Sequence, residues 1–325
     1  MEETYNCVII LGPTAVGKTA LGVRLAYEKG GEVISSDSRQ VYKGLDIGSG
    51  KDLSDYEVKT SDGNSFHVPY HLIDVATLDR EYNVYSYQRD FYKVFADMQE
   101  RNVLPVIVGG TGMYIDAIVR GYDFIEVAEN KELRAKAEAM SLEELDEWLL
   151  SLKPKLHNKS DLLQRERVIR AIEIAEFMKS DECKEARKTY PKRPDVKPLI
   201  IGTTLERAVL RESIAKRLKA RLEEGMIDEV RNLHEKCGYS YERLEKLGLE
   251  YRFVSEFLEG KIESEEVLFT KLNTAIGQFA KRQETWFRGM QKKGVNINWL
   301  PSVLDVNVRY ESLLELTKVM RWQLL

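Results

Sequence analysis

The chain is poor in cysteine and has no long apolar run. Its three cysteines, Cys7, Cys183 and Cys237, are far apart and form no C-x-x-C pair. This spacing suggests neither a disulfide framework nor a zinc site. No apolar stretch is long enough to span a membrane, and no basic segment followed by an apolar one opens the sequence. We therefore expect a cytoplasmic protein that makes no membrane contact.

The chain also has little net charge, because 49 Lys and Arg residues nearly balance 53 Asp and Glu residues and leave −4. This balance argues against bulk polyelectrolyte binding, so any nucleic-acid contact must come from a local basic face. With 325 residues, 43% of them hydrophobic, the chain can bury a large core in one large domain or two.

The most informative segment reads G-x-x-x-x-G-K-T and directly follows the apolar run 8–11. A strand, a glycine-rich turn and a helix in this order form a phosphate-binding P-loop, whose backbone N–H groups point at the anion. The phosphate-binding residues are then Gly12, Pro13, Thr14, Ala15, Val16, Gly17, Lys18 and Thr19. We expect Lys18 to neutralise phosphate oxygens and the Thr19 hydroxyl to coordinate Mg²⁺. The motif leaves open which phosphate compound binds.

Short apolar runs alternate with helical patterns along the rest of the chain. A helix over 19–28 should end at Gly30 and Gly31. Asp62 and Gly63 predict a hairpin that joins 56–59 to 65–68. The further strands are predicted at 32–35, 71–75, 104–108, 197–202 and 295–299. This order predicts an α/β fold with a P-loop NTPase-like parallel sheet flanked by helices.

The character of the sequence changes between about residues 122 and 194, which are highly charged and poor in strand patterns. Apolar residues at helical spacing predict helices over 133–140, 142–152 and 162–178. We interpret 122–194 as a helical insertion that interrupts a catalytic core of 1–121 and 195–325. The alternative is that these helices simply extend the same core.

Two polar residues follow predicted strands at the sheet edge where ligands of open α/β folds bind. Asp37, after the second strand, could be a general base, a magnesium ligand or a cap of its own loop. Thr111, in the run Gly-Gly-Thr-Gly-Met, could be a helix N-cap or could place its hydroxyl near the phosphates. His67 and His71 are four apart, but Pro69 breaks any helix that would align them on a metal.

Two helical segments carry basic residues. Arg167 and Arg170 share a face beside Ile169, and a salt-bridged solvated face is the default interpretation. A second helix is expected to start near Lys271. Its core face would hold Leu272, Ile276, Phe279 and Trp286, and its other face would hold Lys281, Thr285 and Arg288. This second face suits an RNA backbone.

Several linked blocks together resemble the tRNA dimethylallyltransferase family over most of the chain. The blocks are 12–19, 34–48, 71–74, 108–114, 167–173 and 281–286. The resemblance implies transfer of a dimethylallyl group from its diphosphate to the N6 amine of the adenosine 3′ to the anticodon. It implies that Asp37 is the general base, that Thr111 assists at the diphosphate and that Arg217 contacts the same anion. The P-loop, Lys18 and Mg²⁺ would stabilise the leaving diphosphate.

The resemblance also implies the partners, which are dimethylallyl diphosphate and the anticodon stem-loop of tRNA, and we expect a monomer. The residues expected to face tRNA are Asp37, Ser38, Arg39, Gln40, Arg134, Arg167, Arg170, Lys281, Arg282, Gln283, Trp286 and Arg288. The segment 247–252 departs from the compact Gly-Tyr turn of the family. Glu166 and Ser213 also stand where a glutamine and an arginine are common.

Three other functions compete with this one. A prenyltransferase acting on free adenine nucleotides would keep the P-loop and Asp37 but would not need the basic helices. A P-loop nucleoside or metabolite kinase would need a nucleotide-base pocket and bound ATP. A non-catalytic RNA-binding module would have no use for Asp37 beside an intact phosphate cradle.

Overall fold

The computed structural model describes residues 4–60, 62–153, 164–318 and 321–322. The chain forms two compact units. The first runs from the N-terminus to Tyr122 and from Arg193 to the C-terminus, and the second is Asp123–Lys192. The second unit lies within the segment 122–194, for which the sequence predicted a helical insertion.

The first unit is built on a six-stranded parallel sheet with the order β6-β3-β7-β2-β8-β9. The strands are β2 (Cys7–Leu11), β3 (Gly31–Ser36), β6 (Tyr70–His71), β7 (Leu104–Gly109), β8 (Pro198–Gly202) and β9 (Asn298–Trp299). The central strands β2 and β7 are wholly buried, as expected of a sheet covered on both faces. The predicted α/β class with a P-loop-type parallel sheet is confirmed.

Two predicted strands are much shorter than expected. The strand expected at 71–75 ends at His71, because Leu72 and Asp74 have φ angles of 60° and 55° and turn the chain out of the sheet. The strand expected at 295–299 pairs with β8 only at Asn298 and Trp299. Both are edge strands, where a single neighbour fixes the register.

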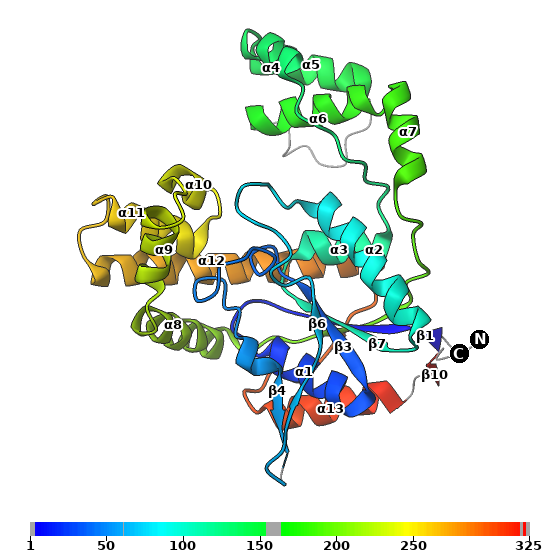
Figure 1. Cartoon of the computed structure of the whole chain (residues 1–325), viewed down its shortest axis with the longest axis vertical. Coiled ribbons are helices and arrows are strands. Elements are labelled where there is room, and N and C mark those ends of the chain that lie inside the picture. The colour runs from blue at the N-terminus through cyan, green and yellow to red at the C-terminus, as the bar shows by residue number, and fades with distance from the viewer. Residues whose placement is uncertain (1–3, 61, 154–163, 319–320, 323–325) are drawn as a thin grey trace. The chain divides into compact units, whose positions relative to one another are not determined.

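Helices cover both faces of the sheet (Figure 1). On one face lie α1 (Lys18–Lys29) and α13 (Val306–Lys318), and on the other lie α2 (Val84–Glu100) and α3 (Gly112–Arg120). Alternate residues of the strands, such as Val8 and Ile10, pack with Leu25 of α1 and Tyr310 of α13. This period of two directs alternate side chains of each strand to opposite faces of the sheet. The P-loop turn directly follows the buried strand β2.

A second core of the same unit is helical. Its helices are α8 (Arg207–Glu223), α9 (Met226–Glu235), α10 (Tyr241–Glu245), α11 (Leu249–Leu258) and α12 (Glu265–Lys292). The loop after β3 joins this core through Val41, Tyr42 and Leu45. Helix α12 starts earlier than the predicted Lys271, because the Ser264 side chain caps it by accepting from the Val267 N–H.

Small strands complete the first unit. The predicted hairpin forms between β4 (Glu57–Lys59) and β5 (Ser65–His67), which pair antiparallel after the 3-10 helix η1 (Leu53–Tyr56). β1 (Thr4–Tyr5) pairs in parallel with β10 (Arg321–Trp322).

The second unit is all helical over its described residues. Its helices are α4 (Lys131–Glu138), α5 (Leu142–Leu152), α6 (Arg165–Phe177) and α7 (Asp181–Thr189). The start of the predicted helix over 162–178 lies outside the described residues, and α7 was not predicted. A small apolar core joins α4, α5 and α6, and Leu145, Leu149 and Ile172 lie at its centre. No helix in the part of the chain that the structure describes is long and apolar enough to cross a membrane.

Candidate active site

The P-loop lies between β2 and α1, and its shape depends on its two glycines. A Cβ atom at Gly12 would lie 2.1 Å from the carbonyl oxygen of Thr203, so only glycine fits there. Gly17 has a φ of 76° and occupies the N-cap position of α1. Lys18 and Thr19 therefore lie in the first turn of the helix, where backbone N–H groups are unpaired and an anion is favoured.

Two cations beside this turn lack a carboxylate partner among the described residues. Lys18 Nζ donates to the Pro13 carbonyl oxygen at 2.6 Å, and Arg217 Nη1 of α8 donates to Thr14 Oγ1 at 3.3 Å. Burial and the nearby Arg217 guanidinium lower the pKa of Lys18 to about 7, and Asp37 opposes this shift. A bound anion would restore the charge of Lys18, so this pair is arranged to receive one.

A buried glutamine ties the P-loop to α12. The Oε1 atom of Gln283 accepts from the Thr14 N–H at 2.9 Å, and its Nε2 atom donates to the Gly110 carbonyl oxygen at 2.8 Å. The sequence predicted that Gln283 faces tRNA, whereas the residue is only 7% exposed and both ends of its amide are bonded within the protein. A tRNA contact by this side chain would break two buried hydrogen bonds.

A buried arginine supports the P-loop from behind. Arg309 of α13 is 2% exposed and donates from Nη1 to the Val16 carbonyl oxygen and, at 3.1 Å, to Thr203 Oγ1. This bond ties the Val16 carbonyl of the P-loop to α13. Sequence reasoning missed Arg309, because nothing in its local pattern reveals a partner nearly the whole chain away.

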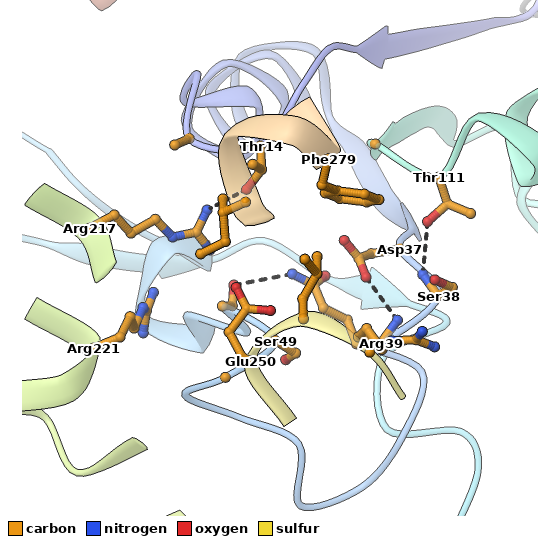
Figure 2. A pocket seen from close by; sticks show the side chains of 18 of the residues that line it. Thr14, Asp37, Ser38, Arg39, Ser49, Thr111, Arg217, Arg221, Glu250 and Phe279 are labelled. Atoms are coloured by element: carbon orange, nitrogen blue, oxygen red, sulfur yellow. Dashed lines mark hydrogen bonds between the residues drawn. The ribbon is translucent and has the colours of Figure 1, made fainter. Parts of the chain in front are cut away.

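Asp37 directly follows β3, and its two carboxylate oxygens lie in different environments. One oxygen, Oδ1, accepts from the Arg39 N–H at 2.8 Å, which is the loop cap considered from the sequence. Figure 2 shows the other oxygen directed into the pocket. Asp37 therefore keeps one carboxylate oxygen for a ligand while the other fixes its position.

Thr111 stands at the N-cap position of α3 but makes no side-chain cap there. Its Oγ1 atom instead accepts from the Ser38 N–H at 3.0 Å. The hydroxyl proton remains able to donate to a third group, because the bond to Ser38 uses only a lone pair. Figure 2 shows Thr111 and Asp37 on the opposite side of the pocket from Arg217 and Arg221.

The loop after Asp37 is held by polar contacts that are mostly part-buried. Gln40 accepts from Ser35 Oγ at 2.9 Å and donates to the Gly50 carbonyl oxygen at 3.1 Å. A Cβ atom at Gly50 would lie 1.7 Å from Nη2 of Arg217, so the loop rests directly on that guanidinium. Glu229 of α9 accepts from three successive loop N–H groups, those of Asp46, Ile47 and Gly48.

These side chains surround a pocket of about 520 Å³, within the usual range for small-ligand sites. Its polar lining includes Lys18, Asp37, Thr111 and Arg217. Its apolar wall is formed by Ile47, Ile214, Leu218, Met226, Ile276 and Phe279. The pocket therefore suits a ligand with a phosphorylated end and a small apolar body.

The sequence did not predict a role for Glu250, which also lines this pocket. Burial raises its pKa to about 7, with Arg217 and Arg39 opposing the shift and Asp37 adding to it. It follows a turn in which Gly248 and Leu249 have φ angles of 77° and 39°. This turn lies where the sequence departs from the family's Gly-Tyr pattern, and that departure was the only signal.

Exposed residues of α12 line two different cavities. Arg282 lines the pocket, whereas Lys281 and Arg288 line a separate groove. Trp286, expected in the core, is 39% exposed and packs so closely on Gly112 that a Cβ atom there would lie 2.4 Å from its ring. Phe279, also expected in the core, is partly buried and lines the pocket.

The second unit places the other predicted tRNA-binding arginines in a different setting. Arg134 donates from Nε to the buried Glu173 at 2.8 Å, and Arg170 donates to the same carboxylate at 3.0 Å. Arg170 also donates to the Val127 carbonyl oxygen at 2.6 Å. Arg167 is exposed on the same helix, α6. Two of the three arginines thus hold the unit together.

The residues fit a magnesium ion held mainly by its ligand. Among the described residues, no group of three or more His, Cys, Asp or Glu side chains could hold a metal. His67 and His71 pair instead with Glu57 and Glu32. Thr19 lines the pocket beside Lys18 and offers one hydroxyl oxygen. Mg²⁺ commonly takes one or two protein oxygens and completes its shell with phosphate and water oxygens.

The fold and this pocket define a P-loop protein with a ligand-sized pocket at the carboxyl edge of a parallel sheet. A family model described as IPP transferase matches residues 40–290, and one described as Isopentenyl transferase matches residues 5–62. The chain belongs to the IPP transferase family.

Relatives with curated names agree. The chain is 50% identical to tRNA dimethylallyltransferase 2 of Treponema denticola over 92% of this chain and 97% of that one. It is 48% identical to tRNA dimethylallyltransferase 1 of Geotalea uraniireducens over 97% and 99%. These findings confirm the resemblance stated from the sequence and the assignment to a family of transferases.

Solved structures agree as well. The crystal structure of tRNA isopentenylpyrophosphate transferase from Bacillus halodurans superposes with a TM-score of 0.65 at 30% identity, covering 98% of this chain and 96% of that one. A eukaryotic dimethylallyltransferase acting on tRNA shares the fold with a TM-score of 0.73 at 19% identity, covering 98% and 81%.

Proposed function

We propose that this enzyme transfers a dimethylallyl group from dimethylallyl diphosphate to the N6 amine of the adenosine 3′ to the anticodon in tRNA. The observation that carries the proposal is the arrangement of the pocket. Lys18 and Arg217, which form no ion pair among the described residues, line one pocket with the Asp37 carboxylate, the Thr111 hydroxyl and several apolar side chains. Figure 2 shows Arg217 across this pocket from Asp37 and Thr111. Membership of the IPP transferase family supports the same reaction.

The diphosphate belongs at the P-loop, where Lys18 and Arg217 neutralise its charge. The dimethylallyl body then lies along the apolar wall near Phe279. As the bond from the first carbon of the prenyl group to its bridging oxygen breaks, negative charge gathers on the leaving diphosphate, which these preorganised cations stabilise. A bound Mg²⁺ at the Thr19 hydroxyl would supply further charge stabilisation at the same oxygens.

The nucleophile is the exocyclic amine of adenine, which is weak and must lose a proton as it forms the new carbon–nitrogen bond. The pocket-facing oxygen of Asp37 is placed to accept that proton. The Thr111 hydroxyl is free to donate toward the leaving oxygen. The adenine must leave its loop stack to reach this depth, as bases usually do in enzymes that modify them.

Recognition of the tRNA would fall to exposed groups of both units. In the first unit these are Ser38, Arg39 and the exposed face of α12. In the second unit, 123–192, they are Arg167 and the solvent-exposed parts of the Arg134 and Arg170 side chains. We also propose that the enzyme acts as a monomer.

The test is mass analysis of unmodified tRNA after incubation with the protein, dimethylallyl diphosphate and Mg²⁺. We expect one added dimethylallyl group on the nucleoside 3′ to the anticodon. Parallel reactions contain AMP in place of tRNA, or ATP with a set of nucleosides. Prenylated AMP without modified tRNA would assign the enzyme to free nucleotides, and phosphoryl transfer from ATP would make it a kinase.

A further inference from the structure

A second cavity, of about 810 Å³, lies between α8 and α12. It shares Ile214 and Gln278 with the active-site pocket, so the two cavities adjoin. Its rim carries four cationic side chains, two from each helix: Arg207, Arg211, Lys281 and Arg288. We call this cavity the α8–α12 groove. The sequence singled out the α12 side of it but gave no role to Arg207 or Arg211.

The cations of the groove are largely without partners. Among the described residues, Arg207, Arg211 and Lys281 form no ion pair, and the nearest carboxylate oxygen to Arg288 is that of Glu284 at 4.0 Å. Glu284 instead accepts from Thr204 Oγ1 at 2.7 Å. Because the whole chain carries a net charge of −4, this groove is a local positive concentration in a slightly acidic protein.

The spacing of the cations indicates an extended anion. Lys281 and Arg288 are seven residues apart on one helix, which separates their backbones by about 10.5 Å along the axis. Arg207 and Arg211 are one turn apart on the other helix, with a separation of about 6 Å. A small diphosphate, for which the P-loop already provides a site, does not extend over two such rows. A nucleic-acid strand presents a phosphate at every nucleotide.

Uncharged acceptors complete the lining. Thr274 and Thr285 of α12 line the groove and each donates its hydroxyl hydrogen to a carbonyl oxygen of the same helix, so their oxygens remain acceptors. The Oδ1 atom of Asn273 is buried there without a hydrogen-bond partner among the described residues. Acceptors of this kind suit the 2′-hydroxyl groups of an RNA backbone. The groove therefore combines the electrostatics and the hydrogen-bonding groups of a backbone-binding surface.

We propose that the α8–α12 groove binds the sugar-phosphate backbone of the tRNA substrate, with Arg207 and Arg211 forming the second wall of a site whose first wall is Lys281 and Arg288. The proposal rests on the proposed function, because it names where that substrate's backbone lies. The contact sets register and affinity and reads no sequence, since phosphates carry none.

The test compares two double variants on the same helix. Arg207→Gln with Arg211→Gln removes two positive charges inside the groove, and Lys216→Gln with Lys219→Gln removes two from exposed positions of α8 outside its lining. The dissociation constant of unmodified tRNA is titrated at several salt concentrations for both, and that of dimethylallyl diphosphate at one. Thermal unfolding checks that each variant folds.

We expect the groove variant to bind tRNA about tenfold more weakly at low salt. Its slope of log affinity against log salt should fall by about one for each lost phosphate contact. The control should change neither, and dimethylallyl diphosphate affinity should be the same in both. Arg207→Glu with Arg211→Glu should weaken tRNA binding further. Equal salt slopes in the groove and control variants would overturn the proposal.

Two further outcomes separate the groove from the reaction. A groove variant that loses dimethylallyl diphosphate affinity while it keeps tRNA affinity would assign the groove to the free diphosphate and overturn the proposal. A wild-type protein that transfers no prenyl group, while the groove variant alone shows weaker tRNA binding and a smaller salt slope, would refute the proposed function and still support the groove.

Discussion

Lys18 in the first unit and Glu173 in the second both have lowered pKa values, but for opposite reasons. Burial and the Arg217 guanidinium lower the pKa of Lys18 to about 7, so the charged form of the lysine is disfavoured. Burial alone would raise the pKa of Glu173, yet hydrogen bonds from Arg134 and Arg170 lower it to about 2, so the charged form of the glutamate is favoured.

The difference is whether the protein itself supplies an ion-pair partner for its charged side chains. The P-loop side of the pocket holds Lys18 and Arg217, which have no ion-pair partner in the part of the chain that the structure describes. The helical unit holds arginines that the fold has already paired. A sequence presents both as basic residues near apolar ones, so only the partner tells a binding residue from a structural one.

The largest effect should come from the P-loop itself. We expect Lys18→Met combined with Thr19→Ala to lower prenyl transfer by about 10⁴-fold or more, because loss of one preorganised donor alone costs about 10²- to 10³-fold. tRNA affinity should hardly change, since this turn holds only the diphosphate. Rapid-quench transfer assays and tRNA titrations measure the two quantities. Transfer at the wild-type rate in Lys18→Met would show that the diphosphate binds elsewhere.

The next largest effect should come from Asp37. We expect Asp37→Ala to lower the single-turnover rate by about 10²- to 10⁴-fold with little loss of dimethylallyl diphosphate affinity, the usual range for removal of a general base. Asp37→Asn is the matched control, because its amide oxygen can still accept from the Arg39 N–H but cannot take a proton. A wild-type rate in Asp37→Asn would leave the residue only its capping role.

Much of the fold follows from local patterns in the sequence. The P-loop, the buried strands β2, β3, β7 and β8, and the hairpin at Asp62 and Gly63 all depend on neighbours a few residues apart. The edge strand expected at 71–75 was wrong beyond His71, because Leu72 and Asp74 have positive φ angles. Leucine rarely adopts such an angle, so the sequence gives no sign of the turn at Leu72. The predicted start of α12 near Lys271 was too late, because the helix begins directly after its cap residue, Ser264.

The candidate site was harder to predict where its contacts are distant in sequence. Gln283 was expected on a tRNA-facing surface, yet it bonds to Thr14 and Gly110 in the core of the site. The helical pattern cannot reveal this, because a buried polar residue and an exposed one share the same periodicity. The sequence predicted no role for Arg309 or Glu250, because their roles depend on partners that are distant in the sequence.

A smaller effect is expected at Glu173. Glu173→Gln should destabilise the helical unit by about 1–3 kcal/mol, the usual cost of losing hydrogen bonds to a charged group. Because the pKa of Glu173 is lower in the folded protein, its contribution is present above the ordinary value of 4.5 and disappears as the pH falls from there toward about 2. Hydrogen exchange of the α6 backbone amides reports this stability.

The same variant tests whether the arginines of the second unit are structural. Unchanged exchange rates in α6 together with a large loss of tRNA affinity would mean that Glu173 positions the arginines for a ligand and does little for the fold. Glu166→Gln, on the exposed side of the same helix, provides a control with the same chemical change.

The last expected effect, confined to alkaline pH, is the pH dependence of diphosphate binding, which Lys18 should govern. Its pKa is about 7 in the free protein, and a bound diphosphate should raise that pKa toward or above the ordinary 10.5, because an adjacent anion favours the ammonium form. Binding then takes up a proton at any pH between the two values. The affinity for dimethylallyl diphosphate should be nearly level below pH 7 and fall by up to tenfold per pH unit above it.

Calorimetry between pH 6 and about 9, in two buffers of different ionisation heat, measures both the affinity and the proton uptake. Lys18→Met removes the lysine while leaving the ligand's own ionisation unchanged, so its curve should be flat in the alkaline range where the wild type declines. Identical pH profiles for the two proteins would mean that the lysine keeps its charge without a ligand, and the contrast with Glu173 would then fail.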